Sequence, residues 1–192
     1  MPRISGDNLQ QHREQLQRRV FDAFAELMAE RTFDAISMAL IAERAELGRT
    51  AIYHHFRDKE AVVVAFATHE TERYVEQLRA ALGDSDDPVE QLRIYLRHHL
   101  EGGEQFHMGL GSQLYGILSP ASRQAIREHV VAVEDVLREI LAGGVRAGVF
   151  SASLDLDGTL SLVHACLSPR HLPPSTIESF VLGGVGAAGS GH

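Results

Sequence analysis

Six polar or aromatic side chains between positions 49 and 59 have the chemistry to bind DNA. They supply hydrogen-bond donors that suit phosphate oxygens and the edges of bases. The six are Arg49, Thr50, Tyr53, His54, Lys59 and the adjoining His55. Ile52 and Phe56 lie one turn apart among them and can anchor the same segment to a core. The spacing predicts a short helix, from about Arg49 to His55, that buries one face and offers the other to DNA.

Two predicted helices precede this segment and must position it. Apolar residues at helical spacing predict a first helix over residues 9–31, and Ser37 is a natural N-cap for a second helix over residues 38–45. The break 46–48 then separates the second helix from the third. Two short helices joined by a three-residue turn and braced by a longer helix form the geometry that presents a helix to the major groove. Short helix pairs occur in many all-α proteins, so the residue types carry the DNA-binding interpretation.

The rest of the chain also reads as helical. Asp58 can cap a long fourth helix that continues to Leu82, and 83–88 is a linker. The next helix is expected at about 89–101, and Gly102-Gly103 should end it. A short or irregular stretch within 104–117 follows, and further helices are expected at 120–148, 154–167 and 177–182. Gly143-Gly144, inside the long helix, indicates a kink or close contact with another helix. No segment alternates like a strand, so we predict an all-α fold.

Charge and composition are compatible with DNA binding and do not establish it. The net charge is −8, but residues 1–60 hold nine Lys/Arg against ten Asp/Glu, so their net charge is only −1. The only cysteine, Cys166, has no internal disulfide partner, which fits a reducing compartment. No segment is long and apolar enough to span a membrane, and the amino terminus does not resemble a signal peptide. We therefore expect a cytoplasmic protein that does not enter membranes.

A second predicted site lies in the carboxy-terminal two thirds of the chain. Apolar residues near 104–117 are mixed with three glycines, which weaken helical packing and leave space for a ligand. The ordinary alternative is that these apolar residues are simply core. The candidate ligand-binding residues are Tyr95, His99, Phe106, His107, Leu114, Tyr115 and His164.

Other functional patterns in the sequence are weak. Residues 184–189 match the Gly-x-Gly-x-x-Gly dinucleotide pattern, but no strand precedes them, so the match is accidental. Eleven histidines suggest a metal, yet no His-x-x-x-His pair places two imidazoles on one helical face, and we expect no metal and no cofactor. No nucleophile elbow, catalytic carboxylate pair or phosphate loop is present, so we expect no enzymatic activity. An enzyme in the histidine-rich half and a metal or redox sensor remain the alternatives.

The segment around the third helix resembles the TetR family of transcriptional regulators. The resemblance runs from about Gln17 to Val64, and its most specific part is Tyr53-His54-His55-Phe56-x-x-Lys59-Glu60. It implies a helix-turn-helix domain of three helices, a fourth helix that leads to a divergent all-helical regulatory domain, and a homodimer held by the last two helices. The DNA contacts that it implies map onto Ser37, Arg49, Thr50, Ala51, Tyr53 and His54, with His55 adjoining, and onto Lys59, which matches a lysine that contacts phosphate.

Two residues of the turn depart from the family pattern. Glu46 stands where the family usually has glycine, and Gly48 where it usually has a serine that caps the recognition helix and touches phosphate. We expect Glu46 to need a positive φ angle, which costs about 1 kcal/mol for a residue other than glycine. Gly48 still caps the helix but offers no hydroxyl, which puts one phosphate contact in doubt.

Together these observations predict a ligand-responsive transcriptional regulator. We expect a helix-turn-helix domain over residues 9–57, a ligand-binding and dimerisation domain over 58–184, and a disordered tail over 185–192. The expected partners are a palindromic DNA operator, a second copy of the chain and a small-molecule effector whose identity the sequence does not give. Repression released by the effector is the favoured mode of action, and activation is the alternative.

Overall fold

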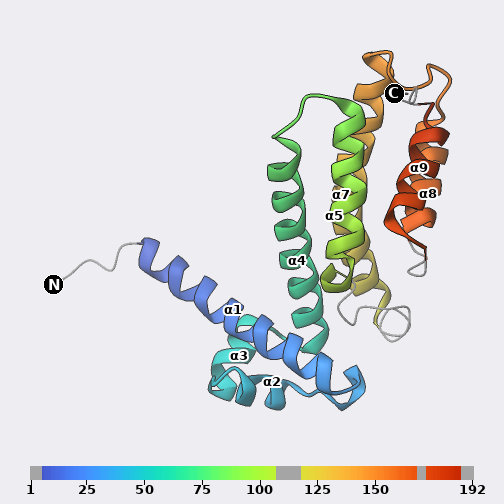
Figure 1. The fold of residues 1–192 in the computed structure, drawn as a ribbon. Coiled ribbons are helices and arrows are strands. Elements are labelled where there is room, and N and C mark those ends of the chain that lie inside the picture. Colours follow the sequence, from blue (N-terminus) through green and yellow to red (C-terminus); the bar gives the residue numbers. More distant parts are fainter. Residues whose placement is uncertain (1–5, 107–117, 168–171, 187–192) are drawn as a thin grey trace. The chain divides into compact units, whose positions relative to one another are not determined.

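The structure, a computed structural model, describes residues 6–106, 118–167 and 172–186 (Figure 1). Within these ranges the regular structure is helical and no strand occurs, which confirms the all-α prediction. The elements are α1 (Gly6–Glu30), the short 3-10 helix η1 (Phe33–Ala35), α2 (Met38–Arg44), α3 (Arg49–His55), α4 (Lys59–Leu82), α5 (Pro88–Phe106), α7 (Pro120–Arg146), α8 (Leu156–Leu167) and α9 (Pro174–Gly184). None of the described helices is long and apolar enough to cross a membrane.

The described residues form two compact units. The first contains residues 6–69 and 118–126, and the second contains 70–106, 127–167 and 172–186. Two helices, α4 and α7, therefore contribute residues to both units. Each unit has a hydrophobic core of its own.

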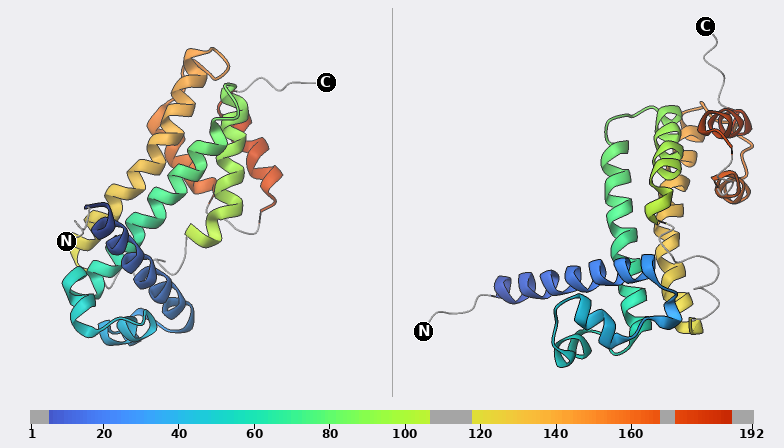
Figure 2. Two further views of the ribbon diagram at one scale, coloured as in Figure 1. Left: turned by 90° about the vertical axis from the view of Figure 1, so that its left-hand side faces the viewer. Right: turned by 60° about the horizontal axis from the view of Figure 1, so that its bottom comes forward.

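In the first unit α1 lies across α2 and α3 (Figure 2). The apolar face predicted for α1 is buried there, with Val20, Phe24 and Leu27 fully covered. Ile52 of α3 is fully buried in the same core, beside Phe56 at the end of that helix. The predicted third helix is thus anchored by the two side chains expected to anchor it.

The core of the second unit is formed by the later part of α4 together with α5, α7, α8 and α9. Helix α5 packs against both α8 and α9. Tyr95 on α5 and Leu137 on α7 are fully buried in this core. An ion pair between Arg93 Nε and Glu178 Oε1, 3.1 Å apart, also joins α5 to α9.

The predicted end of α5 at Gly102-Gly103 is wrong, because the helix continues to Phe106. Glycine ends a helix by taking a left-handed conformation, and among the described glycines only Gly148 and Gly186 have a positive φ angle. The predicted disordered tail also begins too early: Val185 is buried in the core, and its carbonyl accepts a hydrogen bond from the Ser151 amide. Residues 187–192, and most of the stretch expected to be irregular, lie outside the described residues.

The glycine pair in α7 is explained by an aromatic ring. A side chain on Gly144 would overlap the ring of Phe150, which is buried, whereas a side chain on Gly143 would meet only the end of Arg146. Phe150 reaches this position because the chain turns back at Gly148, where φ is +71°. The close contact expected at this pair is therefore with a side chain of the following loop and not with another helix.

Candidate nucleic-acid interface and regulatory site

Helix α2 begins at Ser37 as predicted and is fixed to α1 by an arginine. The Ser37 hydroxyl accepts a hydrogen bond from the Leu40 amide at 3.2 Å, which satisfies a donor at the helix end. Near the other end of α2, Arg44 donates to Glu26 at 3.0 Å and to Glu30 at 2.9 Å, both on α1. The hydrogen bond from Arg44 lowers the pKa of Glu30, so this pair stays charged at neutral pH.

The turn between α2 and α3 is a Schellman motif built on a glutamate. The Leu47 amide donates to the Ala42 carbonyl at 2.8 Å, and the Glu46 amide donates to the Glu43 carbonyl at 3.0 Å. Glu46 has a φ of +52°, which confirms the positive angle expected from the sequence. Glycine takes this conformation without steric cost, whereas a glutamate takes it only with steric strain.

Arg19 on α1 supports this turn, and sequence reasoning missed it. Its Nη2 donates to the carbonyls of Ala45 and Glu46, at 2.6 Å and 2.8 Å, and lies 3.6 Å from the Glu46 carboxylate. Ala45 is the C-cap of α2, so its carbonyl is one that the helix leaves without a helical partner, and Glu46 follows it in the turn. The strained residue is therefore held from outside the turn, by a residue 27 positions away.

The exposed face of α3 gathers the predicted DNA-binding side chains. Arg49, Thr50, Tyr53 and His54 are exposed, whereas Ala51 and His55 are half-buried. The guanidinium of Arg49 lies 5.8 Å from the centre of the Tyr53 ring, within the range of a cation–π contact. Gly48 precedes the helix in an extended conformation and provides no side-chain cap, as expected. The helix thus presents donors and an aromatic ring on one side and its core anchors on the other.

Lys59 has a structural contact that the sequence did not predict. Its Nζ donates to the carbonyls of Phe33 and Ile36, at 2.9 Å and 3.1 Å, and lies 4.2 Å from the centre of the Phe33 ring. These carbonyls belong to η1 and the residue that follows it, so Lys59 ties that segment to the start of α4. Next to it, Asp58 accepts from the Ala61 amide at 2.8 Å, which confirms the predicted cap of α4.

Glu60 joins the first turn of α4 to the start of α7. Its carboxylate accepts from the Ser119 amide at 3.2 Å and from the Ser122 hydroxyl at 2.7 Å. The side chains of Ser119 and Ser122, and to a smaller extent the Ser119 amide, lower the pKa of Glu60, and the Ser122 side chain is buried. A carboxylate at the amino-terminal end of α7 also matches the dipole of that helix.

Three of the predicted ligand-binding residues meet in the second unit. Tyr95 lies with its hydroxyl 3.1 Å from Nε2 of His164, and its ring stacks on His99 with centroids 6.1 Å apart. Tyr74 on α4, which is not among the predicted ligand-binding residues, joins them with its hydroxyl 3.2 Å from Nδ1 of His99. Glu134 approaches the other side of His164, with 4.0 Å between Oε1 and Nδ1. We call Tyr74, Tyr95, His99 and His164 the tyrosine–histidine cluster.

Burial favours the uncharged forms of two tyrosines and two histidines in this region. It raises the pKa of Tyr74 and of Tyr95, and it lowers the pKa of His164 despite the nearby Glu134. It also lowers the pKa of His98, whose ring lies 4.8 Å from that of Tyr74. Within the described part of the chain, Nδ1 of His98 is buried without a hydrogen-bond partner.

The other predicted ligand-binding residues lie outside what the structure describes. This applies to His107, Leu114 and Tyr115, and to the side chain of Phe106. Among the described residues, no group of three His, Cys, Asp or Glu side chains is placed to hold a metal.

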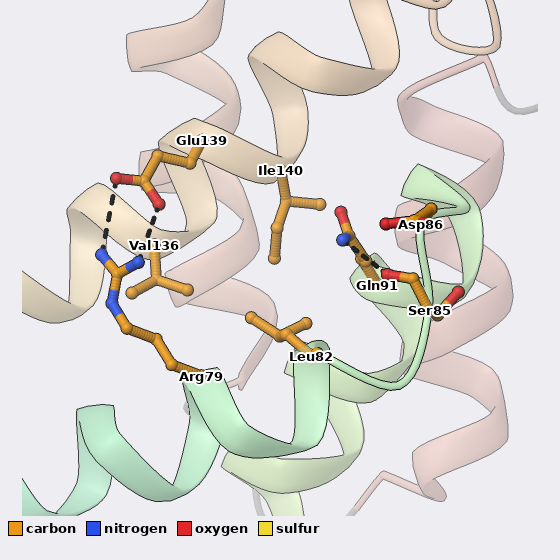
Figure 3. Close-up of a pocket in the computed structure, with 9 residues that line it drawn as sticks. Arg79, Leu82, Ser85, Asp86, Gln91, Val136, Glu139 and Ile140 are labelled. Atoms are coloured by element: carbon orange, nitrogen blue, oxygen red, sulfur yellow. Dashed lines mark hydrogen bonds and ion pairs between the residues drawn. The ribbon is translucent and has the colours of Figure 1, made fainter.

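A pocket of about 290 Å³ that the sequence did not predict opens between α4, α5 and α7 (Figure 3). Leu82, Val136 and Ile140 contribute its apolar side chains. At one end Arg79 makes a pair of hydrogen bonds to Glu139, at 3.3 Å and 3.4 Å. At the other end Asp86 and Ser85 lie close to Gln91, whose side chain donates to the Ser85 carbonyl at 2.8 Å.

Comparison with known proteins assigns the first unit to a family. Residues 20–66 match the family described as bacterial regulatory proteins, tetR family. An HTH-type transcriptional repressor of Mycobacterium tuberculosis is 36% identical over 73 residues, which cover 38% of this chain and 37% of the repressor. A fatty acid metabolism regulator protein of Bacillus subtilis is 24% identical over 140 residues, 71% of this chain and 72% of that protein.

A solved structure resembles the chain over most of its length. It is the transcriptional regulator FadR of Bacillus subtilis in complex with stearoyl-CoA, with a TM-score of 0.71 at 18% identity over 87% of this chain and 88% of that one. The resemblance to the M. tuberculosis repressor spans little more than a third of that protein, whereas the fold is shared across both units. The match over residues 20–66 contains α2, the turn and α3, with Lys59 and Glu60 beyond them. Residues 20–66 of the chain therefore match the tetR family of bacterial regulatory proteins, and the fold of the rest resembles that of a regulator solved with its ligand.

Proposed function

We propose that the chain is a cytoplasmic, homodimeric repressor that binds an operator through α3 and releases it when a small molecule binds in the carboxy-terminal part. The main support is the exposed face of α3, where Arg49, Thr50, Tyr53 and His54 accompany a buried Ile52 in a segment with the family match. On this proposal residues 9–57 act as the DNA-binding domain and residues 58–184 as the ligand-binding and dimerisation domain. Ser37, Ala51 and His55 complete the DNA-facing set, and Lys59 contacts phosphate while it holds η1.

Exposed apolar side chains on the last two helices support the dimer. Leu162 on α8 is 67% exposed and Phe180 on α9 is 69% exposed, although both helices bury their other faces. Large apolar side chains in this position favour contact with the same helices of a second copy. A two-fold dimer then places two α3 helices in successive major grooves, roughly 34 Å apart on a near-palindromic operator.

A pair of charge substitutions tests the dimer. Phe180→Glu should convert the protein to a monomer in light-scattering measurements, because it places a charge in the apolar contact. Val131→Glu is the matched control: Val131 is 49% exposed on α7, and this variant should remain dimeric. A dimeric Phe180→Glu variant would place the interface elsewhere.

DNA binding can be tested on duplexes that the protein itself selects from a randomised library. Fluorescence anisotropy then measures its affinity for the selected duplex. Tyr53→Ala should weaken binding at least tenfold, whereas Arg79→Ala, an exposed arginine of the second unit, should not. Lys59→Ala should reduce the salt dependence by about one phosphate contact. Unchanged binding by both Tyr53→Ala and Lys59→Ala would refute the proposed docking.

The proposed effector site is the tyrosine–histidine cluster. An effector weakens operator binding only by as much as it prefers the released state. Stearoyl-CoA, the ligand named for the Bacillus subtilis neighbour, is a reasonable first probe, and it should displace the selected duplex from the wild-type protein. Tyr95→Phe removes the hydroxyl beside His164 and should shift the probe concentration needed for release. If the probe binds but never changes DNA affinity, stearoyl-CoA is not an effector.

A further inference from the structure

Positive or protonatable side chains gather where α1 passes the end of α3. His12 and Arg13 lie one turn before Leu16, which is buried in the same core as Ile52 of α3. A residue three or four positions before a buried one lies on the same side of the helix. His12 and Arg13, which are both exposed, therefore extend that side of α1 beyond the edge of the core.

The end of α3 supplies two more such groups. The rings of His54 and His55 meet edge to face with centroids 5.4 Å apart, His54 exposed and His55 half-buried. Burial lowers the pKa of His55, and the positive charges of His54, Arg13 and His12 lower it further. We call His12, Arg13, His54 and His55 the histidine patch.

Other carboxylates and titratable groups lie near the patch in the sequence or on the helices packed against it. Asp58, three residues after His55, is 3.0 Å from Arg57 and also caps α4. Glu14 on α1 is exposed, and no carboxylate acts on the pKa of His55 in the described structure. From α4, His69 faces the core and stacks on Phe21, 5.2 Å away. The groups that act on His55 are therefore basic or protonatable, although the whole chain carries a net charge of −8.

We propose that the histidine patch is a second phosphate-binding surface beside the recognition helix, and that its imidazoles take up protons as DNA binds. The inference rests on the proposed DNA-binding function. Duplex DNA is the partner favoured by the structure, because His54 also belongs to the exposed face of α3 that carries Arg49 and Tyr53. Arg13 then contributes a permanent charge from α1, and the histidines contribute charges that depend on pH.

The direction of the pH effect follows from electrostatics. A phosphate beside an imidazole favours its charged form and raises its pKa, which opposes the effect of burial and of the neighbouring cations on His55. Binding is then coupled to proton uptake, so DNA affinity increases as pH falls. One proton taken up per site corresponds to about a tenfold change in affinity per pH unit.

The test is a pH series with the selected duplex at constant ionic strength. Wild-type affinity should increase as the pH falls from 8 to 6.5, by up to about tenfold per pH unit for each proton taken up. His55→Gln should flatten this dependence, and His55→Arg should bind tightly at pH 8 with little dependence on pH. Arg13→Gln should reduce the salt dependence by about one phosphate contact at every pH. His69→Gln, which removes a histidine of the same unit away from the patch, should keep the wild-type pH dependence.

The outcomes separate this inference from the proposed function. Thermal denaturation followed by circular dichroism first establishes that each variant is folded. Failure to bind any duplex between pH 6.5 and pH 8 would overturn both proposals. Binding that does not depend on pH, or a pH dependence that His12→Gln, His54→Gln and His55→Gln all retain, would overturn the histidine patch and leave DNA binding through α3 intact.

Discussion

The turn before the recognition helix gives a quantitative prediction at Glu46. A left-handed conformation costs a residue other than glycine about 1–2 kcal/mol. Glycine at the same place removes that cost but adds about 0.4–1 kcal/mol of backbone entropy to be lost on folding. The ion pair with Arg19 is exposed and contributes little. Glu46→Gly should therefore stabilise the protein by about 0.8 kcal/mol, the centre of a range from about 0 to 1.6 kcal/mol.

Urea denaturation measures this difference, and Glu46→Ala provides the control. Alanine also loses the carboxylate but keeps the left-handed strain, so Glu46→Ala should be less stable than Glu46→Gly by roughly 1 kcal/mol. The midpoint should shift while the slope with urea stays constant, because the surface exposed on unfolding is unchanged. In a chain of this length the corresponding shift in Tm is about 2–4 °C per kcal/mol. An alanine variant as stable as the glycine variant would refute the explanation by backbone strain.

Three further predictions concern single positions. Gly48→Ser should tighten DNA binding about threefold to tenfold through one added hydroxyl contact, because nothing lies within 4 Å of the new side chain, and Gly48→Ala should give no gain by the same anisotropy assay. Gly144→Ala should lower the stability measured in urea by roughly 1–3 kcal/mol through overlap with Phe150, whereas Gly143→Ala should raise it slightly. Arg19→Met should cost about 1–3 kcal/mol in the same denaturation assay, because it leaves the carbonyls at the end of α2 without their donor.

The parts of the fold that the sequence predicted well depend on local chemistry. The N-cap at Ser37, the limits of α3 and the positive φ of Glu46 each follow from a residue and its near neighbours, and the structure confirms all three. The end of α5 was predicted wrongly for a related reason. Gly102-Gly103 has the composition of a helix end but does not take the left-handed conformation that ends one.

The contacts that the sequence did not predict join residues far apart in the chain. Lys59 reaches Phe33 across 26 positions, and Glu60 reaches Ser122 across 62. Within the tyrosine–histidine cluster, Tyr74 contacts His99 across 25 positions. No periodic pattern encodes such pairs, because each is a single long-range contact made after the helices have packed. A family motif can indicate that a residue such as Lys59 has a function, but it does not reveal which carbonyls the residue binds.

Three long-range contacts of the first unit fix segments before and after the helix pair α2 and α3. The end of α2 is held by Arg19, the segment before α2 by Lys59, and the start of α7 by Glu60. Local chemistry alone would make the α2–α3 turn weak, because Glu46 is strained and Gly48 gives no side-chain cap. Contacts from α1 and α4 therefore help to position the recognition helix, in addition to its own turn.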